Sequence, residues 1–449
     1  MNSSEPTSAR LAWKGYEKFL FRFFFIYFLL QIFPFDWKFY RELFLINWEN
    51  LSFGDIFELT RYSPRFFGGL PTYADWALIA VAALMGAGIW TYKDRKSENY
   101  LFLYYWLRVL LRYRLAAGLI GYAFIKIFPI QSPYPSLSNL NTNYGDFTAW
   151  KIFSMSLGIV PGYESFLGVM ELLAAALLLY RKTVTVGSFM VLMFTGNVFL
   201  SNLAYEGGEA VYSLYLLSIA AFLIAYDVKR LYNLFGREVP VLPPEFYIHR
   251  DNAWYKKVRL GLKNLFLYVF VVLYGYKTRQ SFHSDTYPYP SVSGLPDISG
   301  VYNVTEFRVN RKVIPYSGIH PYRWKDVVFE KWATMSIRSN RPLIIDSTYR
   351  EVAVENDEQR NDELSGAGGR HYFAYTADLG AHILSLKNKN KHHSDEMLKL
   401  HYERPSNTRI ILSGINEKND SLYVVLDKVN RRYLLEEADR LGRGQNIKL

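Results

Sequence analysis

The sequence predicts a polytopic α-helical membrane protein of about seven spans with a C-terminal antiparallel β domain, a lipocalin-like barrel or sandwich. Two observations lead to this prediction. Up to about residue 278 the chain consists mostly of long apolar, aromatic segments, and beyond it the sequence is polar, charged and alternating at period two. The mean hydropathy of -0.04 conceals this division, because an apolar part and a polar part average to neutrality.

Seven segments reach the length of a membrane span. The first is predicted to be retained, because it lacks a small-residue cleavage site and runs directly into a charged stretch. The third carries Arg108, Arg112 and Arg114, whose side chains are expected to extend to the headgroups. The predicted spans are 19–35, 76–92, a segment within 100–128, 163–180, 184–204, 210–226 and 260–276.

The net charge of +11 is spread along the chain as clusters at the ends of apolar segments. This alternation of basic ends predicts that the N-terminus lies inside and that residues beyond 278 lie outside. We therefore assign the basic excess to topology and to membrane lipids, and expect no nucleic-acid partner. The clusters are Arg10, Lys14, Lys18 and Arg22; Lys93, Arg95 and Lys96; Arg181 and Lys182; Lys229, Arg230 and Arg237; and Lys256, Lys257, Arg259 and Lys263.

Changes of composition mark the domain boundaries. Residues 129–162 are loop-like, with an amphipathic stretch at 150–157 that is predicted to be interfacial or re-entrant. Alternating runs at 301–309, 408–412 and 421–426, separated by turn signals, indicate roughly eight to ten strands of an up-and-down barrel or sandwich. The predicted parts are 1–99, two N-terminal spans and an outer loop; 100–235, a four-helix unit; 236–278, a basic cytoplasmic connection and the seventh span; 279–298, a linker; and 299–449, the β domain.

Several kinds of chemistry are excluded by residue type. The chain has no cysteine, which excludes thiolate catalysis, disulfide exchange, Cys-ligated zinc and iron–sulfur clusters. All eight histidines lie outside the predicted spans, without metal-ligand spacing, and no nucleotide-binding glycine fingerprint is present. We therefore expect no haem, metal or nucleotide, and a redox cofactor would be a diffusible quinone or belong to a partner chain.

Glu171 is the sharpest candidate for a functional side chain within the membrane. It lies eight residues beyond Tyr163, which corresponds to about 12 Å along a helix and places it near the middle of the bilayer. A carboxylate at that depth costs roughly 2.5–3.5 kcal/mol, so Glu171 should face the bundle and be protonated or paired. Asn197 and Asn202 are the expected partners, and their positions about 140° apart on a helix allow only one to face it squarely.

Other polar residues near the ends of the spans extend this candidate site. The stretch from Arg114 to Lys126 places two glycines on one face, where a neighbouring helix can approach closely. Lys126 is expected to extend to the outer interface, with the role of a buried catalytic amine as the alternative. Glu206 and Glu209 are expected in a solvated loop. The candidate intramembrane polar pocket is Arg114, Lys126, Glu171, Asn197 and Asn202.

A set of spaced residues between Arg114 and Tyr232 resembles the pattern of a known family of small bacterial membrane proteins. The set is Arg114, Gly118, Gly121 and Lys126; Gly168-Val-Met-Glu171; Arg181-Lys182-Thr183 with Gly187; Asn197; and Asp227. In this pattern the block is similar to the four-helix unit of the DoxX family. The additional N-terminal spans and the trailing β domain resemble the long DoxX-family proteins of Bacteroidetes-like bacteria.

The resemblance implies a location and two classes of function. It implies a bacterial inner membrane, with the N-terminus in the cytoplasm and the β domain in the periplasm. A non-catalytic component of an envelope complex, which assists assembly or binds lipid or partner proteins, is the preferred function. The alternative is a membrane subunit of a quinone-linked oxidoreductase, because some family members resemble subunits of a thiosulfate:quinone oxidoreductase. The absence of cysteine favours the first class over a sulfur relay.

Overall fold

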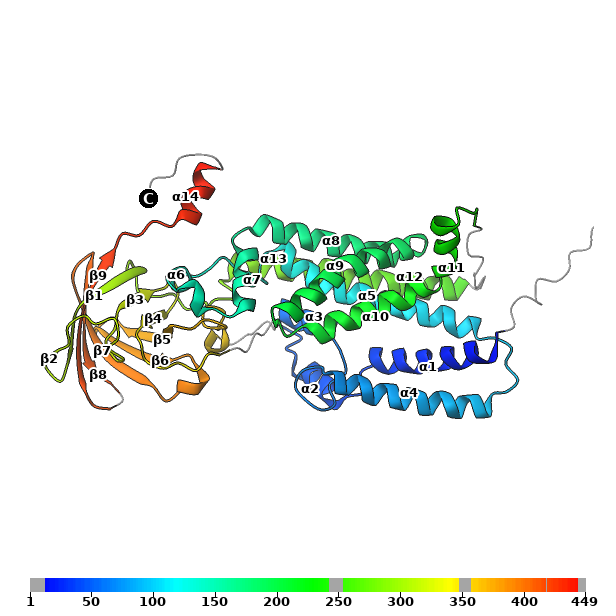
Figure 1. Cartoon of the computed structure of the whole chain (residues 1–449), viewed down its shortest axis with the longest axis horizontal. Helices are drawn as coiled ribbons and strands as arrows, with labels where there is room; N and C mark the ends of the chain where they lie inside the picture. The colour runs from blue at the N-terminus through cyan, green and yellow to red at the C-terminus, as the bar shows by residue number, and fades with distance from the viewer. Residues whose placement is uncertain (1–12, 242–252, 347–356, 417, 443–449) are drawn as a thin grey trace, which may run out of the picture. The chain divides into compact units, whose positions relative to one another are not determined.

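The computed structural model describes residues 13–241, 253–346, 357–416 and 418–442. They form two compact units (Figure 1). The first contains the described residues of Met1–Ile127 and Phe166–Thr278, and the second those of Phe128–Ser165 and Arg279–Leu449. The predicted basic residue Arg10 and the part 242–252 of the predicted cytoplasmic connection lie outside the described residues.

The first unit is helical, and α5 is its central helix. This helix spans Leu101–Ile127 and packs against α1, α3, α10 and the π-helical residues 268–273. The helices are α1 Gly15–Ile32, α2 Trp37–Leu45, α3 Phe53–Thr60, α4 Tyr73–Lys93, α5 Leu101–Ile127, α8 Pro161–Leu179, α9 Val184–Ala204, α10 Ala210–Ala225, α11 Val228–Leu231, α12 Ala253–Leu267 and α13 Tyr274–Ser284. The first residues of α8 and the last of α13 belong to the second unit.

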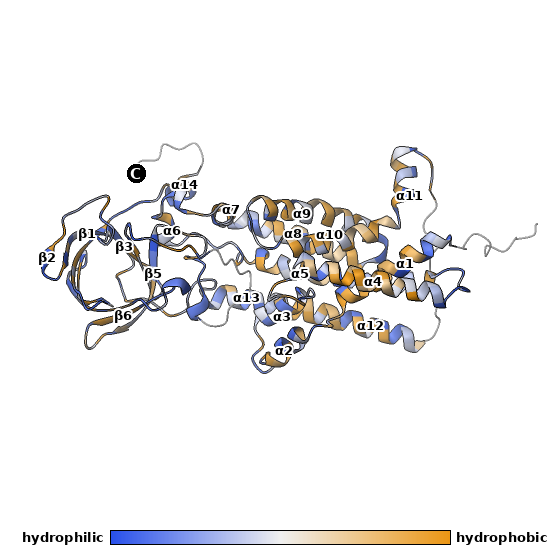
Figure 2. Ribbon diagram, turned by 60° about the horizontal axis from the view of Figure 1, so that its bottom comes forward, coloured by the Kyte–Doolittle hydropathy of each residue, from blue (hydrophilic) through white to orange (hydrophobic). Residues whose placement is uncertain are grey.

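Apolar helices long enough to cross a membrane are present in this unit. Among the described residues, five helical segments satisfy length and apolarity, or six if α10 and the residues after its 64° bend are one span. Figure 2 shows the hydrophobic residues along α4, α9 and α10. These segments fit the predicted multi-pass membrane protein. Helix α5 is long enough to cross a membrane, but its four basic residues make it too polar to be included among these segments. The total of seven spans therefore stays a prediction.

Glycine on α5 allows the close helix approach that the sequence predicts. A Cβ atom at Gly118 would lie 2.7 Å from the hydroxyl oxygen of Tyr212 and 2.9 Å from a methyl carbon of Leu216, both on α10. A larger side chain would therefore require the ends of the Tyr212 and Leu216 side chains to move.

The second unit contains a closed, antiparallel, eight-stranded β-barrel, as the alternating sequence predicts. Neighbouring strands follow one another in chain order, and β1 closes the barrel by pairing with β9, while the short β2 pairs only with β1. The predicted runs correspond to β1, β8 and β9. The strands are β1 Gly300–Val309, β2 Lys312–Val313, β3 Asp326–Phe329, β4 Thr334–Arg338, β5 Arg370–Asp378, β6 Ile383–Asn388, β7 Met397–Ser406, β8 Arg409–Ile415 and β9 Ser421–Val429.

The barrel interior is filled by alternate residues of its strands. Along β7, for example, Leu398, Leu400 and Tyr402 are buried, while the residues between them are exposed. This alternation follows from the two-residue period of a strand. Trp324, which is 8% exposed, belongs to the same core.

Residues 128–165 belong to the second unit, although the sequence analysis places them within the four-helix unit. They contain α6 (Leu137–Leu140) and α7 (Ala149–Gly158), and a further helix, α14 (Leu434–Leu441), follows β9. The Lys151 ammonium lies 3.1 Å from the Asp362 carboxylate, and Ser138 donates a 2.6 Å hydrogen bond to Glu330. The amphipathic character expected of an interfacial or re-entrant segment is thus explained by contacts within this unit.

Candidate functional site

Lys126 and Glu171 form a buried ion pair in the helical unit. Lys126 lies in the last turn of α5 and Glu171 lies on α8, and their side chains are only 11% and 10% exposed. Gly168 permits the contact, because a Cβ atom there would lie 2.6 Å from the backbone oxygen of Ala123. Within the described residues, the second carboxylate oxygen of Glu171 has no hydrogen-bond partner. Lys126 therefore occupies the place beside Glu171 where the sequence analysis expects an asparagine.

Arg114 is bound to the end of α3 rather than to Glu171. Its guanidinium donates a 2.7 Å hydrogen bond to the Thr60 carbonyl oxygen and another to that of Tyr62, and lies 5.4 Å from the Tyr215 ring centre. Thr60 is the last residue of α3, so the guanidinium satisfies carbonyls that a helix end leaves without partners. This arrangement gives Arg114 a structural role.

The two predicted asparagines lie apart from the ion pair. Asn202 donates to the Val198 carbonyl oxygen over 2.9 Å and accepts from the Glu209 backbone N–H over 3.0 Å, which fixes the connection between α9 and α10. Asn197 is exposed on α9. Of the five candidate residues, the described structure joins Lys126 and Glu171 directly, and a single pocket formed by all five stays a prediction.

Glu209 is a correction to the sequence analysis, which expects it in a solvated loop. Its carboxylate pairs with the Arg61 guanidinium and accepts a 3.2 Å hydrogen bond from the Tyr122 hydroxyl, and its side chain is 14% exposed. Arg61 follows α3, far away in the sequence, so the local loop pattern around Glu209 contains no sign of this pairing.

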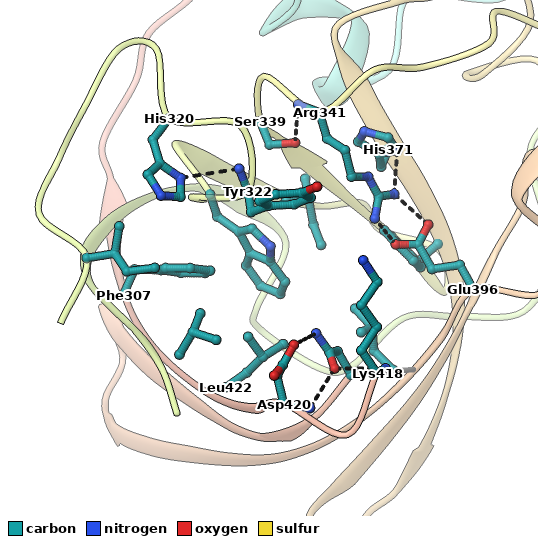
Figure 3. Close-up of a pocket in the computed structure, with 17 residues that line it drawn as sticks. Phe307, His320, Tyr322, Ser339, Arg341, His371, Glu396, Lys418, Asp420 and Leu422 are labelled. Carbon is teal, nitrogen blue, oxygen red and sulfur yellow. Dashed lines mark hydrogen bonds and ion pairs between the residues drawn. The ribbon is translucent and has the colours of Figure 1, made fainter. Parts of the chain in front are cut away.

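A second candidate site is a cavity of 450 Å³ at one end of the barrel (Figure 3). Its volume lies within the range of small-molecule sites, roughly 300–1,000 Å³. The connections β2–β3 and β8–β9 and the ends of several strands contribute to its wall. Nine aliphatic and aromatic side chains line it: Phe307, Val309, Ile314, Tyr322, Trp324, Ile337, Phe373, Leu398 and Leu422.

A hydrogen-bonded cluster lies on one side of this cavity. The Arg341 guanidinium makes a two-pronged ion pair with the Glu396 carboxylate and donates to Nδ1 of His371 over 2.9 Å. Asn388 donates a further 2.6 Å hydrogen bond to Glu396. Although burial opposes it, Arg341 holds the pKa of Glu396 below its usual value. Burial and the Arg341 charge lower the pKa of His371 to about 4, so this imidazole is neutral at pH 7.

Lys418 and Asp420 also line the cavity, from the β8–β9 connection. Asn310 and Asn416 donate hydrogen bonds of 2.7 and 3.3 Å to the Asp420 carboxylate and lower its pKa. The Lys418 side chain extends into the cavity and its ammonium lies 5.7 Å from the Tyr322 ring centre (Figure 3). The sequence analysis missed these residues, because they come from separate turns and only the closure of the barrel brings them together.

Comparison with known proteins gives no relative from which a role could be transferred. In the described residues, no group of three or more histidine, aspartate or glutamate side chains has an arrangement that could hold a metal ion. No family model, no curated protein and no solved structure matches this chain.

Proposed function

We propose that this chain is a DoxX-like, multi-pass protein of a bacterial inner membrane that serves as a non-catalytic envelope component and binds an apolar small molecule in its barrel. The apolar helices support the membrane location. The alternating basic ends of the predicted spans support a cytoplasmic N-terminus and a periplasmic barrel.

The barrel cavity is the observation that carries this proposal. Concave, mostly apolar sites with a few placed polar groups are typical of small-molecule binding. Here aromatic and aliphatic side chains line the wall, and the polar cluster Arg341, Glu396 and His371 is joined by internal hydrogen bonds. Because these polar groups satisfy one another, the arrangement favours holding a ligand over transforming it.

The test is to identify what the full-length protein retains during purification in mild detergent. We expect native mass spectrometry to detect a bound apolar molecule that is lost in Leu422→Trp, since the larger ring would fill the cavity. Tyr423→Trp is the matched control, because successive strand residues point to opposite faces and Tyr423 is not among the cavity residues.

Two results would contradict the proposal. One is the absence of any bound small molecule from both the unaltered protein and the control variant. The other is a co-purified quinone that undergoes reduction and is unaffected by Leu422→Trp, which would favour the alternative of an oxidoreductase subunit.

A further inference from the structure

The charged groups around the barrel cavity differ in whether they already have partners. Arg341 is neutralised by Glu396 through two hydrogen bonds, one of them 2.6 Å long. His371 lies beside this pair, and its Nδ1 accepts a hydrogen bond from Arg341 because a guanidinium can only donate. The side of the cavity formed by these three residues therefore presents no uncompensated charge to a ligand.

Lys418 differs from Arg341, because the described residues that line the cavity offer it no ion pair. It lies near enough to Asp420 for its charge to help lower the pKa of that carboxyl, but Asp420 is bound to Asn310 and Asn416. The Lys418 ammonium lies 5.7 Å from the centre of the Tyr322 ring. A primary ammonium carries three donors, so it can bind an acidic group while keeping the contact with the ring.

An apolar wall lines the same cavity as this ammonium. Phe307, Trp324 and Leu422 line the cavity together with Lys418 and belong to the buried core of the barrel. A ligand that satisfies both features carries one acidic group at the mouth and an apolar body inside.

We propose that the cavity binds a single-chain carboxylate amphiphile, with its carboxylate on the Lys418 ammonium and its chain against Phe307, Trp324 and Leu422. A carboxylate supplies one negative charge, which matches one ammonium that has no ion pair among the described lining residues. A phosphate monoester carries about −1.5 to −2 charges at pH 7 and would leave part of its charge unpaired beside Asp420. This inference rests on the proposed function and specifies its ligand class.

The test uses the full chain in zwitterionic lipid nanodiscs and a photoreactive, diazirine-bearing dodecanoic acid as the probe. After illumination, mass spectrometry compares labelling of β1 and the β8–β9 connection with labelling of the helices. We expect the acid to label the barrel, and its methyl ester and the corresponding alkyl phosphate to label it about tenfold less. A hydrogen bond to a charged group contributes about 1.5 kcal/mol or more, which corresponds to that factor.

Variants of Lys418 separate the charge from the shape of the cavity. Lys418→Met should reduce acid labelling of the barrel by about tenfold, whereas Lys418→Arg should retain most of it. Lys399→Met is the matched control, because Lys399 is exposed on β7 and points away from the interior. Circular dichroism of each variant establishes that the barrel is folded.

The outcomes distinguish this inference from the proposed function. Equal labelling of the barrel by acid and ester, unchanged in Lys418→Met, would overturn the carboxylate inference and leave apolar binding intact. Stronger labelling by the alkyl phosphate would overturn it in favour of a phosphate-headed amphiphile. Labelling confined to the helices with every probe would overturn both.

Discussion

The Lys126–Glu171 ion pair allows a quantitative test of how the helical unit is held together. Glu171→Gln keeps the size of the side chain and removes its charge, which leaves the Lys126 ammonium without its partner. Lys126→Met does the reverse and leaves the Glu171 carboxylate uncompensated. The double variant removes both charges and leaves two side chains of similar length.

The expected magnitudes follow from the burial of the pair. Both side chains are about nine-tenths buried, so neither is released to solvent when the other is altered. Removing one partner of a buried ion pair costs about 3–5 kcal/mol, whereas replacing both is often nearly neutral. We therefore expect each single variant to lower the free energy of unfolding by about 3 kcal/mol. The double variant should recover most of that loss.

The measurement is the free energy of unfolding of the full chain in mild detergent, from denaturant titrations followed by circular dichroism. Glu206→Gln is the matched control, since Glu206 is exposed and its loss of charge should leave stability unchanged. The reasoning would be refuted if Glu171→Gln were as stable as the unaltered protein. It would also be refuted if the losses of the two single variants simply added in the double variant.

Two further predictions concern the barrel and the topology. The pKa of His371 is about 4 in the folded barrel and 6.5 ordinarily, so on acidification the unfolded chain binds the proton first. The free energy of unfolding of the barrel should therefore fall by up to about 3 kcal/mol as the pH falls from 6.5 to 4. His371→Asn should flatten this dependence in hydrogen exchange of β5 amides, whereas the exposed His401→Asn should not; equal slopes would contradict the assignment. A periplasm-active reporter fused after Leu449 should be active and a cytoplasm-active reporter inactive, and the reverse pattern would overturn the predicted orientation.

The barrel was predictable because each of several strands has a recognisable local sequence pattern. The runs at 301–309, 408–412 and 421–426 alternate at period two, and this alternation is the direct consequence of having one face in the core. The closing contact between β1 and β9 is different, since it joins residues more than a hundred positions apart. The contribution of residues 128–165 is equally non-local: the Ser138 backbone and hydroxyl groups bind Glu330 across 192 positions of sequence.

The helical unit was predicted well where helices are apolar and poorly where they are charged. A hydropathy profile includes the charged residues of a segment, but it contains no information about the groups that bind those charges in the folded protein. On α5, Arg112 donates hydrogen bonds of 2.9 and 3.1 Å to the carbonyl oxygens of Leu178 and Leu179 at the end of α8, and Arg114 does the same at the end of α3. Two of the arginines expected to extend to the headgroups thus bind carbonyl oxygens at helix ends, and their depth in the membrane stays a prediction.

These partnerships change where function should be sought. The sequence draws attention to Glu171, because an intramembrane carboxylate is costly and such residues are often functional. In the structure Lys126 supplies its countercharge, and Arg112 and Arg114 of α5 bind backbone carbonyls, so these charges stabilise the packing of the helices. The barrel cavity combines an apolar wall with the Lys418 ammonium, for which the described lining residues provide no ion pair. We therefore place the functional hypothesis in the barrel, where an exposed ammonium without an ion pair among the described lining residues lies beside an apolar wall.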